Sequence, residues 1–188
     1  MTRRGALSED AFATRFQEGA RALWCIAYGI LMDRNLAEDA VQEAALVGFE
    51  KIAQFDPETN FQAWMSQIVR FSALNMARRK QRRKASNDAL EFVEADTQSS
   101  HLHPPSTISG TGKLFDDAEA FDDQTRAALL RLDEDARACL LLRTLEELSY
   151  REIAQSLDMV EGTAMSHVHR ARQRMRTWLT QAAAEASA

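Results

Sequence analysis

The sequence predicts an all-α protein made of two small helical domains, and three observations carry this prediction. Glycine (7) and proline (3) are scarce among the 188 residues, whereas alanine and the aliphatic residues dominate, a composition that favours helices. Apolar residues recur at helical spacing in several segments. No run alternates between apolar and polar residues for long enough to predict a strand.

The two domains are separated by a segment that lacks hydrophobic periodicity. This segment contains Pro104-Pro105 and a cluster of serine, threonine and glycine, which is typical of a linker. Its composition cannot bury enough apolar surface to order the chain. We therefore predict one domain at residues 1–85, a flexible acidic linker at 86–117 and a second domain at 118–188.

Three helices are expected in the first domain. The first runs from about residue 10 to 31. The second follows Asn35, whose side chain can cap the helix, with Glu38 at the capping-box position. The third begins after Asn60, another potential cap, and runs into a basic segment.

The second domain is expected to contain a helix-turn-helix. Helices are predicted at about 118–132, 134–146 and 161–182. Before the last of these, Ser149 and Glu152 have the spacing of a capping box and fix the start of a short helix. A short helix, a tight turn and a basic helix form a helix-turn-helix. Ala154 and Gly162 are small at positions where its two helices would approach closely.

The second helix of such a motif enters the major groove and presents its N-terminal residues to base edges. The candidates for this contact are Met165, Ser166, His167, His169 and Arg170. The arginines that follow, Arg172, Arg174 and Arg176, suit phosphate contacts, which position a protein without reading sequence. A basic amphipathic helix that docks on an acidic protein would give the same pattern.

The charges are segregated, although the net charge is −5. Seven basic residues and no acidic one lie between Arg70 and Lys84. From Ala85 to Thr125 there are nine acidic residues and one basic residue. Two basic patches on either side of an acidic stretch indicate two contacts with a polyanion, unless these faces are merely solvated.

Two stripes run along the helix that follows Asn35. The core-facing stripe has helical spacing and contains Ala37, Ala40, Val41, Ala44, Gly48 and Ile52. The second stripe contains Asp39, Gln42, Leu46 and Phe49. An exposed leucine and phenylalanine beside polar groups suit a protein interface. The alternative is that Leu46 and Phe49 pack under another helix.

The third helix combines aromatic residues with a basic continuation. Trp64, Ile68, Phe71 and Asn75 lie along one side and lead into the basic run. Single-stranded DNA needs rings on which bases stack and cations for the backbone. Such a stripe is more often core, and Trp64 and Phe71 are compatible with either interpretation.

The segments that carry these patterns resemble a known family. The stretch from Asn35 to Arg83, with FDPETNFQAWMSQIVRF at its centre, resembles region two of extracytoplasmic-function sigma factors. The stretch from Leu132 to Arg176, with LSYREIAQSL, resembles region four. The two stretches occur in the order of the family, with an acidic linker in place of region three, and together they cover about half of the chain.

The resemblance implies a role in transcription initiation together with core RNA polymerase and promoter DNA. Binding to the clamp helices of the β′ subunit would use Asp39, Gln42, Glu43, Leu46 and Phe49. Melting and reading of the minus-ten element would use Asn60, Trp64, Phe71, Asn75, Arg78, Arg79, Arg82 and Arg83. Region four would lie on the β flap and read the minus-thirty-five element through Arg151, Met165, Ser166, His167, His169, Arg170, Arg172 and Arg174. An anti-sigma factor is a further expected partner.

The sequence departs from the family pattern in region four. The family usually has basic residues where Met165 and His167 stand, and glycine and proline where Asp158 and Val160 stand. Two lost charges weaken phosphate or guanine contacts. The minus-thirty-five preference of better-known members therefore does not transfer to this chain.

Other classes of protein fit less well. A plain helix-turn-helix regulator that binds duplex DNA without polymerase would explain only the last seventy residues or so. No nucleophile–base pair or phosphate-binding glycine loop points to an enzyme or a cofactor, and the histidines do not have metal-ligand spacing. Without an apolar run long enough for a membrane span or a secretory signal, we expect a cytoplasmic protein, with Cys25 and Cys139 as reduced core residues.

Overall fold

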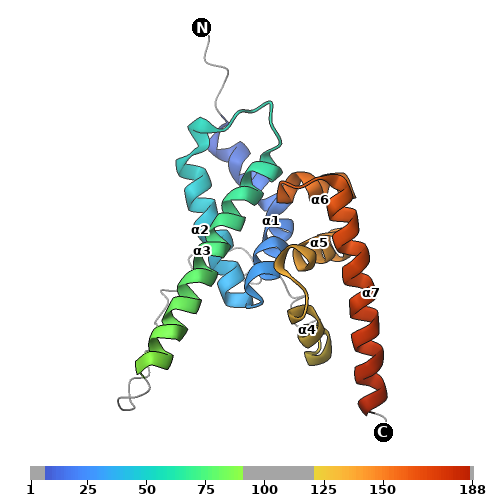
Figure 1. The fold of residues 1–188 in the computed structure, drawn as a ribbon. Helices are drawn as coiled ribbons and strands as arrows, with labels where there is room; N and C mark the ends of the chain where they lie inside the picture. The colour runs from blue at the N-terminus through green and yellow to red at the C-terminus, as the bar shows by residue number, and fades with distance from the viewer. Residues whose placement is uncertain (1–6, 91–120, 187–188) are drawn as a thin grey trace.

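The computed structural model describes residues 7–90 and 121–186, and every regular element in these two ranges is a helix. The first range, here called the N-terminal unit, contains α1 (Glu9–Leu31), α2 (Arg34–Glu50), the short 3-10 helix η1 (Ile52–Gln54) and α3 (Phe61–Leu90). The second range, the C-terminal unit, contains α4 (Asp123–Leu130), α5 (Glu134–Leu145), α6 (Tyr150–Leu157) and α7 (Glu161–Ala186). The prediction of an all-α protein with two helical parts is thereby confirmed (Figure 1). The predicted linker lies largely outside the described residues.

Side-chain caps set most of the helix starts. Asn60 caps α3 as predicted, because its Oδ1 accepts from the Ala63 N–H at 3.1 Å. The predicted cap of α2 was wrong: Asp33 takes that place, and its carboxylate accepts from the Leu36 N–H at 3.3 Å. Aspartate and asparagine accept equally well from the unpaired N–H groups of a first helical turn. Because Asp33 is the cap, Asn35 lies within the first turn of α2, where it is exposed.

The capping box of α6 is present as the sequence predicts. The Glu152 N–H donates to Ser149 Oγ, and the Ser149 N–H donates to Glu152 Oε2 at 2.8 Å. Hydrogen bonds from the Ser149 side chain and backbone lower the pKa of the Glu152 carboxyl.

Replacing Ser149 with alanine should therefore lower the free energy of unfolding by about 1 kcal/mol. Because the pKa of Glu152 is lowered in the folded chain, its share of this stability is present above the ordinary carboxyl pKa and disappears as the pH falls through the folded value. Urea unfolding of both proteins at neutral and at acidic pH measures the effect. An equal difference at both pH values would show that Glu152 contributes nothing through its charge.

The three long helices of the N-terminal unit pack on one another around small residues of α2. Ala37, Ala40 and Ala44 are fully buried, and the predicted core stripe of this helix is confirmed up to Gly48. Ile52 lies beyond the end of α2, in η1, and is only partly buried. A cluster of aromatic rings closes the end of this unit that carries η1, formed by Phe12, Phe55, Phe61 and Trp64.

In the C-terminal unit, α7 packs along α4, α5 and α6. The predicted helix at about 118–132 is shorter than expected, because α4 begins at Asp123 behind the cap Asp122. The prediction that Gly162 lies at a close helix contact was wrong, because a Cβ placed there would have no neighbour within 4 Å. It occupies the first turn of α7, where the helix faces outward, whereas Ala154 is buried as expected.

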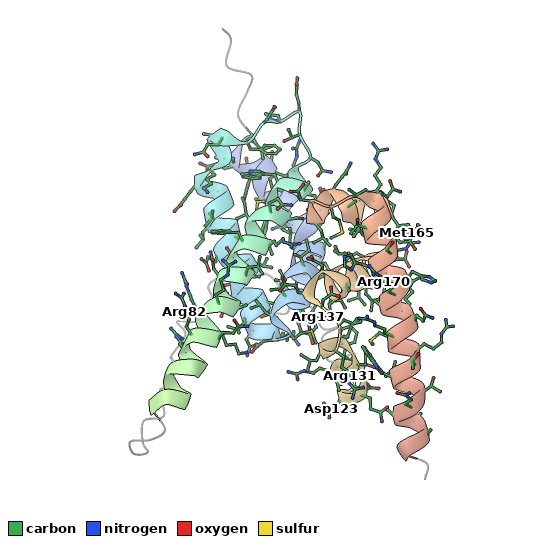
Figure 2. The ribbon with its side chains drawn as sticks, viewed as in Figure 1. Arg82, Asp123, Arg131, Arg137, Met165 and Arg170 are labelled. Atoms are coloured by element: carbon green, nitrogen blue, oxygen red, sulfur yellow. The ribbon has the colours of Figure 1, made fainter. Side chains whose placement is uncertain are left out.

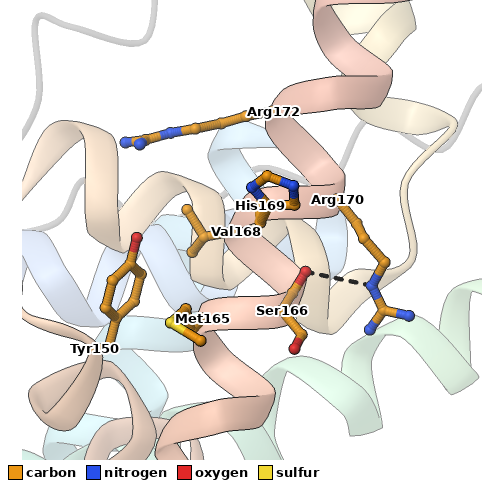
Figure 3. Close-up of a pocket in the computed structure, with 7 residues that line it drawn as sticks. All are labelled: Tyr150, Met165, Ser166, Val168, His169, Arg170 and Arg172. Carbon is orange, nitrogen blue, oxygen red and sulfur yellow. Dashed lines mark hydrogen bonds between the residues drawn. The ribbon is translucent and has the colours of Figure 1, made fainter.

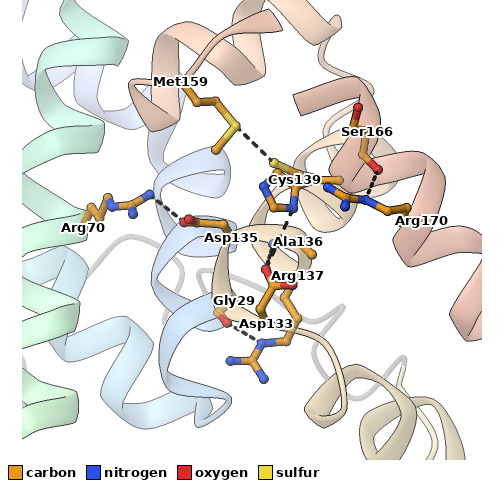
Figure 4. Close-up of polar contacts among 11 residues, drawn as sticks. Gly29, Arg70, Asp133, Asp135, Ala136, Arg137, Cys139, Met159, Ser166 and Arg170 are labelled. Atoms are coloured by element: carbon orange, nitrogen blue, oxygen red, sulfur yellow. Dashed lines mark hydrogen bonds and ion pairs between the residues drawn. The ribbon is translucent and has the colours of Figure 1, made fainter. Parts of the chain in front are cut away.

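The two units are in direct contact, which the sequence did not predict. Helix α1 packs against α5, and α3 against α6 (Figure 1). A Cβ added at Gly29 of α1 would lie only 2.9 Å from the backbone of Ala138 in α5. The Arg137 guanidinium donates through Nε to the Gly29 carbonyl at 2.6 Å, and Arg70 pairs with Asp135 at 2.8 Å (Figure 4).

None of the helices within the described ranges combines the length and the apolarity that a membrane span requires. Both cysteines are buried and free, as predicted for core residues. Burial raises the pKa of each thiol, Cys25 and Cys139, to about 12.

Candidate nucleic-acid interface

The far part of α3 forms a basic surface that extends away from the rest of the N-terminal unit. Arg78, Arg79, Arg82 and Arg83 are all exposed, and Arg82 lies on the protruding segment of the helix (Figure 2). Lys80, on the same stretch, pairs with Asp33 at the start of α2 at 3.1 Å. The exposed guanidinium groups of this surface are suited to contact a nucleic-acid backbone.

The aromatic residues predicted for DNA stacking divide into two kinds. Trp64 is partly buried, with its ring centroid 5.0 Å from that of Phe55 and 5.8 Å from that of Phe61, so its main contacts are in the core. Phe71 is 66% exposed, two turns further along α3 toward the basic surface. Asn75, one turn beyond Phe71, is half-buried. The structure thus brings Phe71 and Asn75 together with the arginines, and places Trp64 in the packing beneath.

Asn60, another residue predicted to contact the minus-ten element, lies near the C-terminal unit and not near the basic surface of α3. Its Oδ1 caps α3, and its Nδ2 donates to Gln155 Oε1 of α6 at 3.3 Å. A side chain predicted to meet the minus-ten element is therefore engaged by the C-terminal unit in this arrangement.

The outer face of α2 carries the predicted polymerase contact. Leu46 is 68% exposed and Phe49 is 42% exposed, although the Phe49 ring also meets Phe12 edge-on at 5.7 Å. Asp39, Gln42 and Glu43 are half-buried on the same helix. Of the two interpretations of the second stripe, the structure favours an open surface at Leu46 and a partly packed one at Phe49.

The N-terminal turns of α7 present most of the predicted base-reading residues to solvent. Met165, Ser166, His169 and Arg170 are exposed, as is Arg151 on α6. His167 lies on another side of the helix, with its Nδ1 3.9 Å from the carboxylate of Asp133. The two neighbouring histidines therefore do not share a face, as helical geometry requires.

A hollow of about 560 Å³ lies between α6 and α7 on this exposed face. The residues around it are Tyr150, Met165, Ser166, Val168, His169, Arg170 and Arg172 (Figure 3). Tyr150 was not predicted as part of this site. The one sequence signal for Tyr150 was its position directly after Ser149. The capping box makes Tyr150 the first residue of α6, at the end of the helix near the hollow.

Arg143 is a second residue that the sequence analysis missed. Its Nη1 donates to the carbonyls of Glu147 at 3.1 Å and Leu148 at 2.9 Å, and its guanidinium lies 5.3 Å from the Tyr150 ring centroid. Glu147 has a left-handed φ of 53°, a conformation that is unfavourable for a side-chain-bearing residue. Arg143 therefore holds the turn that leads into α6.

Among the described histidines, cysteines and acidic residues, no group of three could hold a metal ion. Two of the four histidines that the sequence offers as metal ligands, His101 and His103, lie outside the described residues.

The fold and these surfaces define a class: a two-part helical DNA-binding protein with an aromatic and basic helix in one part and a helix-turn-helix in the other. Residues 16–83 match the family described as sigma-70 region 2, and residues 122–175 match sigma-70 region 4. An extracytoplasmic-function RNA polymerase sigma-E factor of Escherichia coli is 30% identical over 141 residues, which are 72% of this chain and 69% of the relative. The chain belongs to the extracytoplasmic-function sigma factors.

Two further comparisons agree with this family. The sigma factor SigE of Mycolicibacterium smegmatis is 28% identical over 90% of this chain, which spans 62% of that relative's length. The solved structure of the sigma factor RpoE in complex with the anti-sigma factor NepR from Bartonella quintana superposes with a TM-score of 0.63. It is 24% identical and the match covers 92% of this chain and 98% of that chain, which supports the fold. The protein is thus an RNA polymerase sigma factor for transcription initiation and not an enzyme.

Proposed function

We propose that this sigma factor divides its work between its two units. Residues 1–85 would act as region two, which binds core polymerase and the minus-ten element. Residues 118–188 would act as region four, which binds the minus-thirty-five element and the β flap, and residues 86–117 would connect them. The observation that carries this proposal is the separation of the exposed functional surfaces: apolar on α2, aromatic and basic on α3, and basic on α7.

On α2, the polymerase contact would be made by Leu46 and Phe49, with Asp39, Gln42 and Glu43 around them. An exposed leucine on an otherwise polar helix face is a feature of interface centres. The partner would be the clamp helices of the β′ subunit, and the working compartment would be the cytoplasm, where the polymerase is.

Replacing Leu46 and Phe49 together with alanine should weaken binding to core polymerase by at least tenfold, since one hot-spot side chain is worth about 2 kcal/mol or more. The fold should survive, because Leu46 is mostly exposed and only Phe49 loses an aromatic contact. Titration of fluorescently labelled sigma factor with core polymerase measures the affinity, and circular dichroism checks the helices. Leu130→Ala, an exposed apolar residue on α4, is the matched control. Unchanged affinity of the double variant would remove these side chains from the interface.

On α3, single-strand capture would use Phe71 and Asn75, with Arg78, Arg79, Arg82 and Arg83 along the backbone. Trp64 would act through the packing that holds this helix rather than by direct stacking, because its ring lies in the aromatic cluster. Asn60 would reach the minus-ten element only after its contact with Gln155 is broken.

On α7, duplex reading would use Met165, Ser166, His169 and Arg170, with Arg172, Arg174 and Arg151 toward the phosphates. His167 would support the entry of the helix through Asp133, its neighbour at the start of α5. An anti-sigma factor is a proposed further partner, because the solved RpoE structure is a complex with one.

A further inference from the structure

We infer that Met165 selects thymine in the minus-thirty-five element by apolar contact with the 5-methyl group of the base. This inference rests on the proposed reading of duplex DNA by α7 and deepens it.

Two polar side chains near Met165 make hydrogen bonds to backbone carbonyls of α7. Ser166 donates from Oγ to the Gly162 carbonyl at 2.8 Å. Arg170 donates from Nε to the Ser166 carbonyl at 3.3 Å (Figure 3). Ser166 Oγ and Arg170 Nε are thereby engaged by the helix backbone. Met165 is 52% exposed in the first turns of α7, where a recognition helix meets base edges. Of the residues that border the hollow between α6 and α7, Met165 is the one large apolar side chain that is mostly exposed.

The surroundings of Met165 match a base edge next to a phosphate backbone. Tyr150 from α6 and Met165 from α7 border the hollow together, while His169 and Arg172 supply its polar and cationic parts (Figure 3). Between Gly162 and Ala184 the helix carries four arginines and no acidic residue. This positive charge favours a nucleic acid as the partner of α7. An acidic protein surface would fit less well, because it would also need an apolar site for Met165.

The chemistry of methionine then determines which base fits. In the major groove, guanine and adenine are recognised by hydrogen bonds at N7 and at O6 or N6, and cytosine by its amino group. A thioether is at most a weak acceptor and offers mainly dispersion contact. Thymine alone among the four bases presents a methyl group in this groove. Met165 therefore favours thymine, and cytosine, a pyrimidine that has an amino group and no methyl group on this edge, is disfavoured.

The test compares thymine with deoxyuridine, which differs only by the 5-methyl group. Polymerase holoenzyme containing this chain first selects promoters from a library randomised over the minus-thirty-five element. Each thymine of the selected element is then replaced by deoxyuridine in a duplex probe, and holoenzyme affinity is measured by filter binding. At one position the replacement should weaken binding about fourfold, the effect of one buried methyl group.

Met165→Ala should bind the thymine and deoxyuridine probes equally at that position. Val160→Ala is the matched control, because Val160 is 74% exposed just before α7 but does not border the hollow; it should keep the fourfold difference. Two results would overturn the inference while leaving DNA reading by α7 intact. One is that Met165→Ala still binds the thymine probe more tightly than the deoxyuridine probe. The other is that the wild type binds the two probes equally at every position. Loss of polymerase affinity in Met165→Ala with the base preference unchanged would also overturn it, in favour of a protein contact. If Arg170→Ala binds every promoter normally, the proposed reading by α7 itself is wrong.

Discussion

Replacing Phe71 with alanine should slow promoter melting by roughly one to two orders of magnitude, because a lost stacking platform costs about 1–3 kcal/mol per base. Phe71 is exposed beside the basic surface of α3, so its ring is available to an unstacked base and is not needed for the core. Asn75→Ala should act at the same step and relax the base preference of the minus-ten element. The affinity of the closed complex should hardly change in either variant.

Permanganate footprinting measures melting in this experiment, and filter binding measures the closed complex. Arg170→Ala is the contrasting variant: it should weaken the closed complex, and a template with a pre-melted bubble should rescue it. Trp64→Ala distinguishes stacking from packing, because its loss of contacts with Phe55 and Phe61 should lower the unfolding temperature as well. Normal melting by Phe71→Ala would show that the exposed ring has another purpose.

The difference between Trp64 and Phe71 shows where sequence reasoning ends. Both residues occupy the same side of α3, and helical spacing alone cannot say how far a neighbouring element covers that side. The covering group is Phe55, which follows η1 and reaches Trp64 but leaves Phe71 open. Whether Trp64 or Phe71 is exposed therefore depends on the short segment around η1 and Phe55. The path of that segment cannot be predicted from hydrophobic periodicity.

Local signals were more dependable than contacts between distant segments. The capping box of Ser149 and Glu152 needs only residues three apart, so its spacing was sufficient. The start of α2 was harder, because Asp33 and Asn35 are both good caps and only the turn after α1 decides between them. Met32, with a left-handed φ of 49°, forms that turn. The small residues of α2 were identified correctly because burial of a helix stripe follows from its own spacing.

The contact between the two units could not be predicted from the sequence, because it joins residues that are distant in the chain. It depends on Gly29 and Ala138, which are far apart in the chain, and nothing in the surroundings of either residue indicates its neighbour. Arg137 and Asp135 could equally have been solvated charges. Instead their partners are the Gly29 carbonyl and Arg70 of the other unit. Burial lowers the pKa of the Arg137 guanidinium, as expected for a charge enclosed between helices.

Replacing Gly29 with leucine should separate the two units while leaving the helices of each intact. The added Cβ would lie 2.9 Å from backbone atoms of Ala138, which cannot rotate away as a side chain can, so α1 and α5 must move apart. Overpacking costs about 1–3 kcal/mol, and loss of the hydrogen bond from Arg137 to the Gly29 carbonyl adds about 1.5–3 kcal/mol. Together they should shift the docking equilibrium by roughly two orders of magnitude or more.

Fluorescence energy transfer between dyes at positions 50 and 181 measures this separation, because both sites are exposed and lie in different units. Cysteines introduced there can be labelled selectively, since Cys25 and Cys139 are buried and their pKa values are raised to about 12. Gly162→Leu is the matched control, because a Cβ at that glycine meets nothing within 4 Å; its transfer efficiency should equal that of the wild type. Gly29→Leu should lower the efficiency with an unchanged helical signal, and it should release Asn60 from Gln155. Equal efficiency in Gly29→Leu and the wild type would mean that the α1–α5 contact does not hold the units together.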